Sequence, residues 1–178
     1  NQIRILFSNL FIVSILLSIG LAVSSQIADP ALQEDHTTVR VIYETDFTFD
    51  VDDVGALAIL HALADNGEAK ILAISYNEVQ SRAADAIDAV NSWYGRGDIP
   101  IGLYDKPLAD PDYSHSFYID RLAGMQNDIT DNVVDSALNV YRQVLSEQPD
   151  NSVTIISVGF LNNLYDLLIE EPELVAQK

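Results

Sequence analysis

The chain has 178 residues, of which 48% are hydrophobic, and 27 Asp and Glu against 9 Lys and Arg give it a formal charge of -18. This acidity excludes a nucleic-acid binder and disfavours peripheral attachment to anionic lipid, because both partners require a basic surface. Since the chain has no cysteine, disulfides, thiol nucleophiles and zinc–thiolate sites are excluded too, which leaves an acidic globular domain that handles a small molecule, a cation or a protein.

Residues 1–25 are predicted to be a targeting segment. No charged residue occurs between Arg4 and Asp29, and the stretch between them is nearly all apolar before it ends in small residues. This pattern is typical of a cleaved secretory signal and predicts a secreted or periplasmic protein. The alternative is an uncleaved membrane anchor, because an apolar run of this length can just cross a bilayer. Residues 26–38 are polar and aperiodic, so we interpret them as a linker to a domain that covers residues 39–178.

Strands and helices alternate along the rest of the chain. Short runs of mostly apolar, often β-branched residues predict strands at residues 39–43, 70–76, 100–104 and 152–158. Apolar residues at helical spacing predict helices at 52–66, 81–94 and 161–170, with Gly67 and Gly95 as stop signals for the first two. A further helix is expected to begin at the capping pair Thr130-Asp131 and to run to Ser146. The alternation predicts an α/β fold, a Rossmann-like, open, mostly parallel sheet with helices on both faces.

The loop after the first strand is unusually acidic, and it lies where ligands bind in such folds, outside the carboxyl ends of the strands. Helix capping can account for one or two of its carboxylates, while so many like charges in one turn raise one another's pKa and repel. A bound divalent cation would relieve the repulsion, and an all-oxygen ligand set favours Ca²⁺ or Mg²⁺ over zinc. A merely solvated acidic turn is the alternative. The carboxylates of the loop are Glu44, Asp46, Asp50, Asp52 and Asp53.

One enzyme class that matches this loop in part is the haloacid-dehalogenase phosphatases, which carry Asp-x-Asp-x-Thr after the first strand of a similar fold. In this chain Glu44, Asp46 and Thr48 occupy the three positions, so a longer carboxylate stands where the nucleophilic Asp is required. The pair Asp52-Asp53 has no place in that motif. A phosphatase is therefore the alternative enzyme.

The chain resembles the inosine/uridine-preferring nucleoside hydrolases more closely. Their signature is an Asp-x-Asp-Pro-Gly-x-Asp-Asp loop, with a longer version in some branches, and it is similar to the segment from Glu44 to Asp53. Two further segments match in order: the strand ending in Asn77 with the helix and DIPIG-like strand after it, and residues 158–164, which resemble a Gly-Pro-Leu-Thr-Asn turn. The match runs from about residue 39 to the end of the chain.

This resemblance implies calcium-dependent hydrolysis of the N-glycosidic bond of a ribonucleoside, giving ribose and a free base. It implies that Asp46 ligates Ca²⁺ and acts as the general base, and that Asp53 is a second metal ligand. A backbone carbonyl of Asn162 would complete the set of metal ligands present in this chain. Asp52 and Asn77 would bind the ribose. The implied partner is a small-molecule nucleoside, with membrane contact only through an uncleaved N-terminal segment, and the sequence leaves a homo-oligomer open.

The chain also departs from the family pattern. Glu44 replaces an Asp, Thr48-Phe49 replaces a pair that contains glycine, and Asn162 replaces a Thr. These departures favour a further alternative, a non-catalytic secreted module that binds a nucleoside or carbohydrate on the same fold. Members of the family are roughly twice as long as this chain, so the resemblance implies an N-terminal half. We expect residues 1–178 alone to be inactive.

Overall fold

A computed structural model of the chain describes residues 38–48, 51–109, 111, 116–127, 129 and 134–178. The segment predicted to be a signal or anchor and the linker up to residue 37 lie outside the described residues, as does Asp50. Their assignments therefore stay predictions. Within the described part of the chain, every helix is too short or too polar to cross a membrane.

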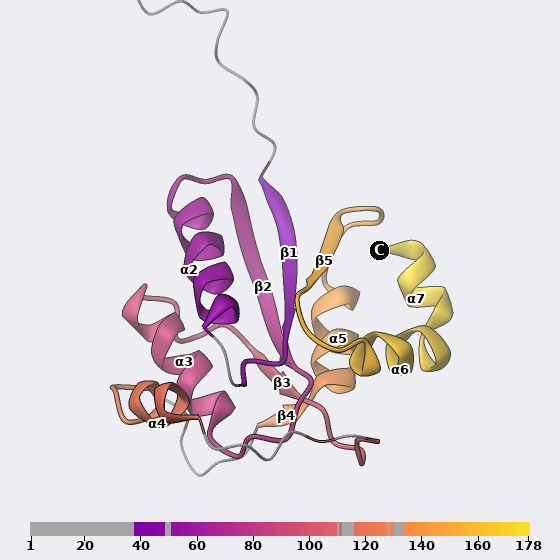
Figure 1. The fold of residues 1–178 in the computed structure, drawn as a ribbon. Helices are drawn as coiled ribbons and strands as arrows, with labels where there is room; N and C mark the ends of the chain where they lie inside the picture. Colours follow the sequence, from indigo (N-terminus) through magenta and orange to yellow (C-terminus); the bar gives the residue numbers. More distant parts are fainter. Residues whose placement is uncertain (1–37, 49–50, 110, 112–115, 128, 130–133) are drawn as a thin grey trace, which may run out of the picture. The chain divides into compact units, whose positions relative to one another are not determined.

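The fold is built on one sheet of five parallel strands, which confirms the predicted α/β class. The strands lie in the order β4-β3-β2-β1-β5 (Figure 1). Their bounds are β1 (Val39–Thr45), β2 (Ala69–Tyr76), β3 (Ile101–Leu103), β4 (Asp135–Ser136) and β5 (Val153–Ser157).

The strand order contains one reversal. The chain builds the sheet outward from β1 to β4 and then returns to pair β5 with the free side of β1. Ligands of open α/β sheets bind at such a reversal, outside the carboxyl ends of the two strands that flank it, which here are β1 and β5. The loop after β1 carries the acidic cluster, and the loop after β5 leads to Asn162, so the reversal brings the two predicted metal-binding segments to one place.

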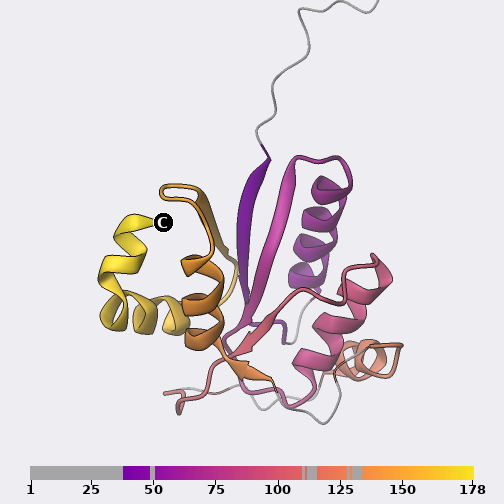
Figure 2. The same cartoon turned by 180° about the vertical axis from the view of Figure 1, so that it is seen from behind.

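Helices cover both faces of the sheet, as Figures 1 and 2 show from opposite sides. On one face lie α2 (Asp52–Asp65), α3 (Ala83–Trp93) and α4 (Phe117–Ala123). On the other lie α5 (Ala137–Ser146), α6 (Asn162–Glu170) and α7 (Pro172–Gln177). Each group of helices encloses its own hydrophobic cluster against the sheet.

The pleat of β1 decides which helix layer each of its side chains meets. Val41 and Tyr43 belong to the cluster under α2 and α3, while Ile42 between them belongs to the cluster under α5. Side chains of a strand alternate between its faces, so Glu44 is directed to the α5 side and Thr45 to the α2 side. This alternation separates the two polar residues at the end of β1 into different environments.

The predicted ends of α2 and α3 are confirmed in detail. Gly67 and Gly95 both have positive φ, of 78° and 71°. After α2, the amide of Gly67 donates to Ala64 and that of Glu68 to Leu63, and the turn after α3 repeats this pattern. Such a paired closure of the last turn requires a left-handed residue, and glycine adopts that conformation without steric cost.

Part of the element prediction was wrong. The helix expected from Thr130-Asp131 begins only at Ala137, where the Ser136 side chain accepts a hydrogen bond from the Asn139 amide at 3.3 Å. The pair Thr130-Asp131 lies outside the described residues. The short elements β4, α4 and α7 were not predicted, because strands of two residues and helices of six or seven leave little periodicity to detect.

Candidate functional site

Asp46 and Asp53 form the acidic centre of the site. Asp46 follows β1 directly and is half-buried, while Asp53, the second residue of α2, is 3% exposed. The two carboxyl groups share a hydrogen bond. The Thr45 hydroxyl donates to Asp53 Oδ1 at 2.5 Å, and the Tyr43 hydroxyl donates to the Asp53 carbonyl at 3.0 Å. These two bonds, both from the α2 face of β1, fix the start of α2 against the strand.

Burial raises the pKa of the Asp53 carboxyl to about 7, and the nearby charges of Asp46 and Asp52 add to the effect. The hydrogen bond from Thr45 opposes it, because it stabilises the carboxylate form. Asp52, the first residue of α2, is exposed, so it can reach a ligand in solvent. The repulsion between carboxylates that the sequence predicts is therefore present between Asp46 and Asp53. A proton on one carboxyl group, or a cation bound to both, would relieve this repulsion.

Glu44 has a different environment on the other face of β1. Its side chain is fully buried, accepts a hydrogen bond from the Tyr141 hydroxyl of α5, and accepts another from Asn77 Nδ2 at 2.9 Å. Burial raises the pKa of Glu44, while the hydrogen bonds from Tyr141, Asn77 and Asn163 lower it. The residue that replaces the family's first Asp is thus held inside the protein by three donors.

Asn77 links the end of β2 to the loop after β5. Its Nδ2 also donates to the Phe160 carbonyl at 2.7 Å, and its Oδ1 accepts from the Phe160 amide at 3.3 Å. The side chain is fully buried. Because Glu44 and Phe160 use both amide hydrogens, the ribose contact predicted for Asn77 would require one of these bonds to open.

Asn162 and Asn163 open α6 and join the same network. Asn162 Nδ2 donates to the Asn77 carbonyl, and Asn163 Nδ2 donates to the Tyr76 carbonyl, both at 3.1 Å. The Oδ1 of Asn162 is buried and has no hydrogen-bond donor among the described residues. The start of α6 is therefore tied to the end of β2 by side-chain amides, with one acceptor still available.

Gly159 permits the close contact between the two loops. A Cβ at this position would lie 2.5 Å from the Asp46 amide nitrogen and 2.8 Å from Asn77 Oδ1. Distances below 3.0 Å are not tolerated by carbon atoms in packed proteins. Only glycine lets the loop after β5 approach the end of β1 so closely, and sequence reasoning placed Gly159 in a motif without finding this role.

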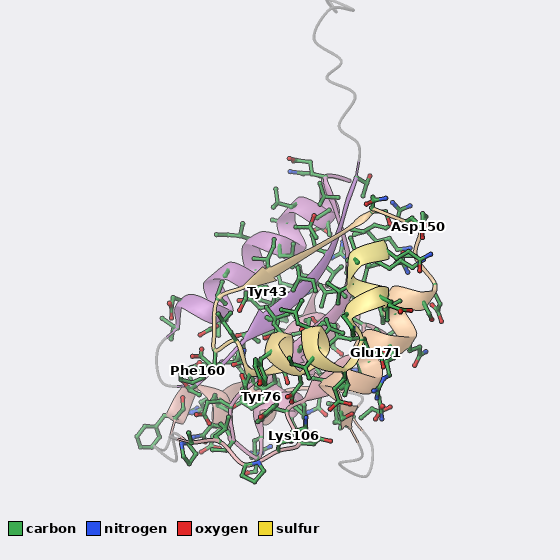
Figure 3. The ribbon with its side chains drawn as sticks, turned by 90° about the vertical axis from the view of Figure 1, so that its right-hand side faces the viewer. Tyr43, Tyr76, Lys106, Asp150, Phe160 and Glu171 are labelled. Atoms are coloured by element: carbon green, nitrogen blue, oxygen red, sulfur yellow. The ribbon has the colours of Figure 1, made fainter. Side chains whose placement is uncertain are left out.

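The sequence-predicted site residues thus gather at one edge of the sheet. Figure 3 shows Phe160, Tyr76 and Lys106 at this carboxyl-terminal edge and Asp150 at the opposite end. Sequence reasoning missed three supporting residues, Thr45, Tyr141 and Asn163, which contact site residues only through the tertiary fold. The signal that could have found Tyr141 is its polar hydroxyl on the apolar stripe of a helix.

The chemistry of the donor atoms fits Ca²⁺, although the ligand set in the described residues is partial. Asp46, Asp53 and Asn162 would supply only oxygen, as a hard cation requires, and the contact between the two carboxyls favours a positive charge between them. Within the described ranges, no three His, Cys, Asp or Glu side chains form a group that could hold a metal. Calcium takes six to eight ligands, so further ligands or waters would be required.

Comparison with known proteins supports the fold. No family model and no curated protein matches the chain. Among solved structures, the chain is similar to the type III effector protein XopQ, crystallised in complex with adenosine diphosphate ribose, with a TM-score of 0.61 and 17% identity. The likeness covers 78% of this chain and 40% of that one, so the chain spans less than half of the length of XopQ. At this identity the likeness shows the α/β architecture alone.

Proposed function

We propose that the protein is a nucleoside hydrolase, which uses calcium to cleave the N-glycosidic bond of ribonucleosides into ribose and a free base. The observation that carries this proposal is that Asp46 and Asp53 are in contact at the reversal of the strand order, where Gly159 brings the loop that leads to Asn162 against Asp46. The complex of XopQ with adenosine diphosphate ribose adds support, because its ligand contains ribose.

The roles proposed for the residues follow from their environments. A bound calcium ion would supply positive charge that makes a nearby water easier to deprotonate. Asp46, which is half-buried, would accept a proton from the attacking water, whose oxygen forms a bond to the anomeric carbon. The electrons of the broken C–N bond leave with the base, which takes up a proton. Asp53, held by Thr45, would share the binding of the cation with Asp46 and the Asn162 carbonyl.

The ribose is the part of the substrate that these residues position. Asp52 is the exposed carboxylate next to Asp53 and would accept a hydrogen bond from a ribose hydroxyl. Asn77 would contribute a donor after it releases Phe160 or Glu44. The sugar develops positive charge as the bond breaks, so nearby carboxylates favour the transition state.

The burial of Glu44 argues against the phosphatase alternative. A nucleophile must reach the phosphorus atom, and Glu44 is fully buried with its oxygens bound to Tyr141 and Asn77. The non-catalytic binding module is the remaining alternative, and it is the outcome if substrate binds without turnover.

The test is release of free base from inosine or uridine by the purified full-length protein, with Ca²⁺ and with a chelator. Asp46→Asn should lower the rate by about 10²–10⁴-fold, the usual contribution of general acid–base catalysis. Asp98→Asn, an exposed carboxylate before β3, is the matched control and should be fully active. Equal turnover by both variants would contradict the role of Asp46, and cleavage of a phosphate ester with Mg²⁺ in place of inosine would overturn the proposal.

A further inference from the structure

A groove lies beside the candidate site, between the loop that follows β3 and the beginning of α6. Its volume of about 590 Å³ falls within the range of small-molecule pockets. Both walls follow the carboxyl ends of strands, so the groove opens on the same edge of the sheet as Asp46 and Asp53. Tyr104 and Leu108 line it on one side, and Phe160, Leu161, Asn162 and Tyr165 on the other.

The walls of this groove are apolar and aromatic. Phe160, Leu161 and Tyr165 are 50%, 64% and 65% exposed, so these large side chains contribute little to the core. The backbone of Phe160 is nevertheless held on both its amide and its carbonyl by the buried Asn77. An aromatic ring that is exposed but rigidly mounted is suited to pack against a flat ligand, because little ordering is required on binding.

Ion pairs hold the two walls together. Lys106, in the loop after β3, lies 2.8 Å from Asp166 and 3.3 Å from Glu170, which are one turn apart on α6. Solvent-exposed pairs of this kind are individually weak, but together they join the loop after β3 to α6. Both partners neutralise the Lys106 ammonium, so the described residues around the groove include no unpaired cation. A groove of this kind favours an uncharged ligand.

Asn162 belongs to both the groove and the candidate calcium site. Its Oδ1 is buried without a donor among the described residues, and an acceptor of this kind is costly unless a ligand or water donates to it. A ligand in the groove can satisfy it with an N–H group when the Asn162 side chain turns toward the groove and releases the Asn77 carbonyl. Asn162 is the residue that the groove shares with the candidate site, so a substrate bound across Asn162 would reach both.

We infer that this groove binds the base of the nucleoside, as a planar, uncharged heteroaromatic ring that stacks on the aromatic walls and donates an N–H to Asn162. The inference rests on the proposed function and adds to it the location of the base. It assigns to Tyr165 and Leu108 a part in substrate affinity and none in calcium binding.

The test measures binding of hypoxanthine, ribose and Ca²⁺ separately to the full-length protein by calorimetry, together with KM and kcat for inosine. Tyr165→Ala and Leu108→Ala should weaken hypoxanthine binding and raise KM about tenfold, as loss of stacking on a base does, with ribose and Ca²⁺ affinities unchanged. Leu168→Ala is the matched control, since Leu168 is exposed on the same helix and does not line the groove. Thermal melting of each variant establishes that it is folded.

The outcomes separate this inference from the proposed function. Active protein whose variants keep the wild-type KM and hypoxanthine affinity would overturn the inference alone and place the base elsewhere. Wild-type protein without nucleoside turnover, and without affinity for either hypoxanthine or ribose, would overturn both. A change of oligomeric state in Leu108→Ala, seen by sedimentation, would show that the groove is an interface between copies of the chain and would also overturn the inference.

Discussion

Replacement of Gly159 by Ala tests the packing of the site directly. The added Cβ would lie 2.5 Å from the Asp46 amide nitrogen, 2.8 Å from Asn77 Oδ1 and 2.9 Å from the Thr45 carbonyl carbon. Ordinary contacts need about 3.5 Å, so the loop after β5 must move away from β1 by roughly 1 Å. Overpacking of this kind costs about 1–3 kcal/mol, which for a domain of this size lowers Tm by roughly 2–12 °C.

The same shift separates Asn162 from Asp46, so we expect Gly159→Ala to weaken Ca²⁺ binding and to lower hydrolysis by about 10²-fold, the effect of a 1 Å misplacement. Urea denaturation and calcium titration measure the two effects. The control is Gly55→Ala in α2, where a Cβ meets nothing within 4 Å and should stabilise the helix by about 0.5–1 kcal/mol. Wild-type stability and calcium affinity in Gly159→Ala would refute the close approach on which the site is built.

Other predictions follow from the buried polar groups. Tyr141→Phe removes a donor from buried Glu44 and should lower the free energy of unfolding by about 1–3 kcal/mol, measured in urea against Tyr165→Phe, whose hydroxyl is on an exposed residue. The pKa of Asp53 is raised to about 7, above its unfolded value of 3.8, so its stabilising effect is fully present below pH 3.8 and is lost as pH rises through 7. Without metal, Tm should therefore be higher at pH 5 than at pH 8, and Asp53→Asn should reduce this difference without abolishing it, because the pKa of Glu44 is raised too. Calcium should raise Tm most at pH 8, where both carboxyls are ionised, and equal shifts at pH 5 and pH 8 would contradict a site at Asp46 and Asp53.

The sequence by itself determined the order and type of the long elements. Periodic apolar residues predict α2 and α3, and Gly67 and Gly95 predict where they end, because the signal for each is contained within one turn of chain. The acidic loop was equally visible, since charge density is a local property. The first residue of α5 could not be predicted from the sequence. Good capping residues occur at Thr130, Asp131 and Ser136, and local preference alone does not choose among them.

Only the tertiary structure decided what the residues at the site contact. The pleat of β1 sends Glu44 and Thr45 to opposite faces, but their partners, Tyr141 on α5 and Asp53 on α2, depend on which helix covers each face. Glu44 and Tyr141 are 97 positions apart in the sequence. Contacts over such a separation form through the packing of whole helices on the sheet, and local sequence patterns carry no record of them. For this reason Glu44, one of five carboxylates in an acidic loop by sequence, is a buried acceptor on the α5 side of β1, while Asp46 and Asp53 share a hydrogen bond on the α2 side.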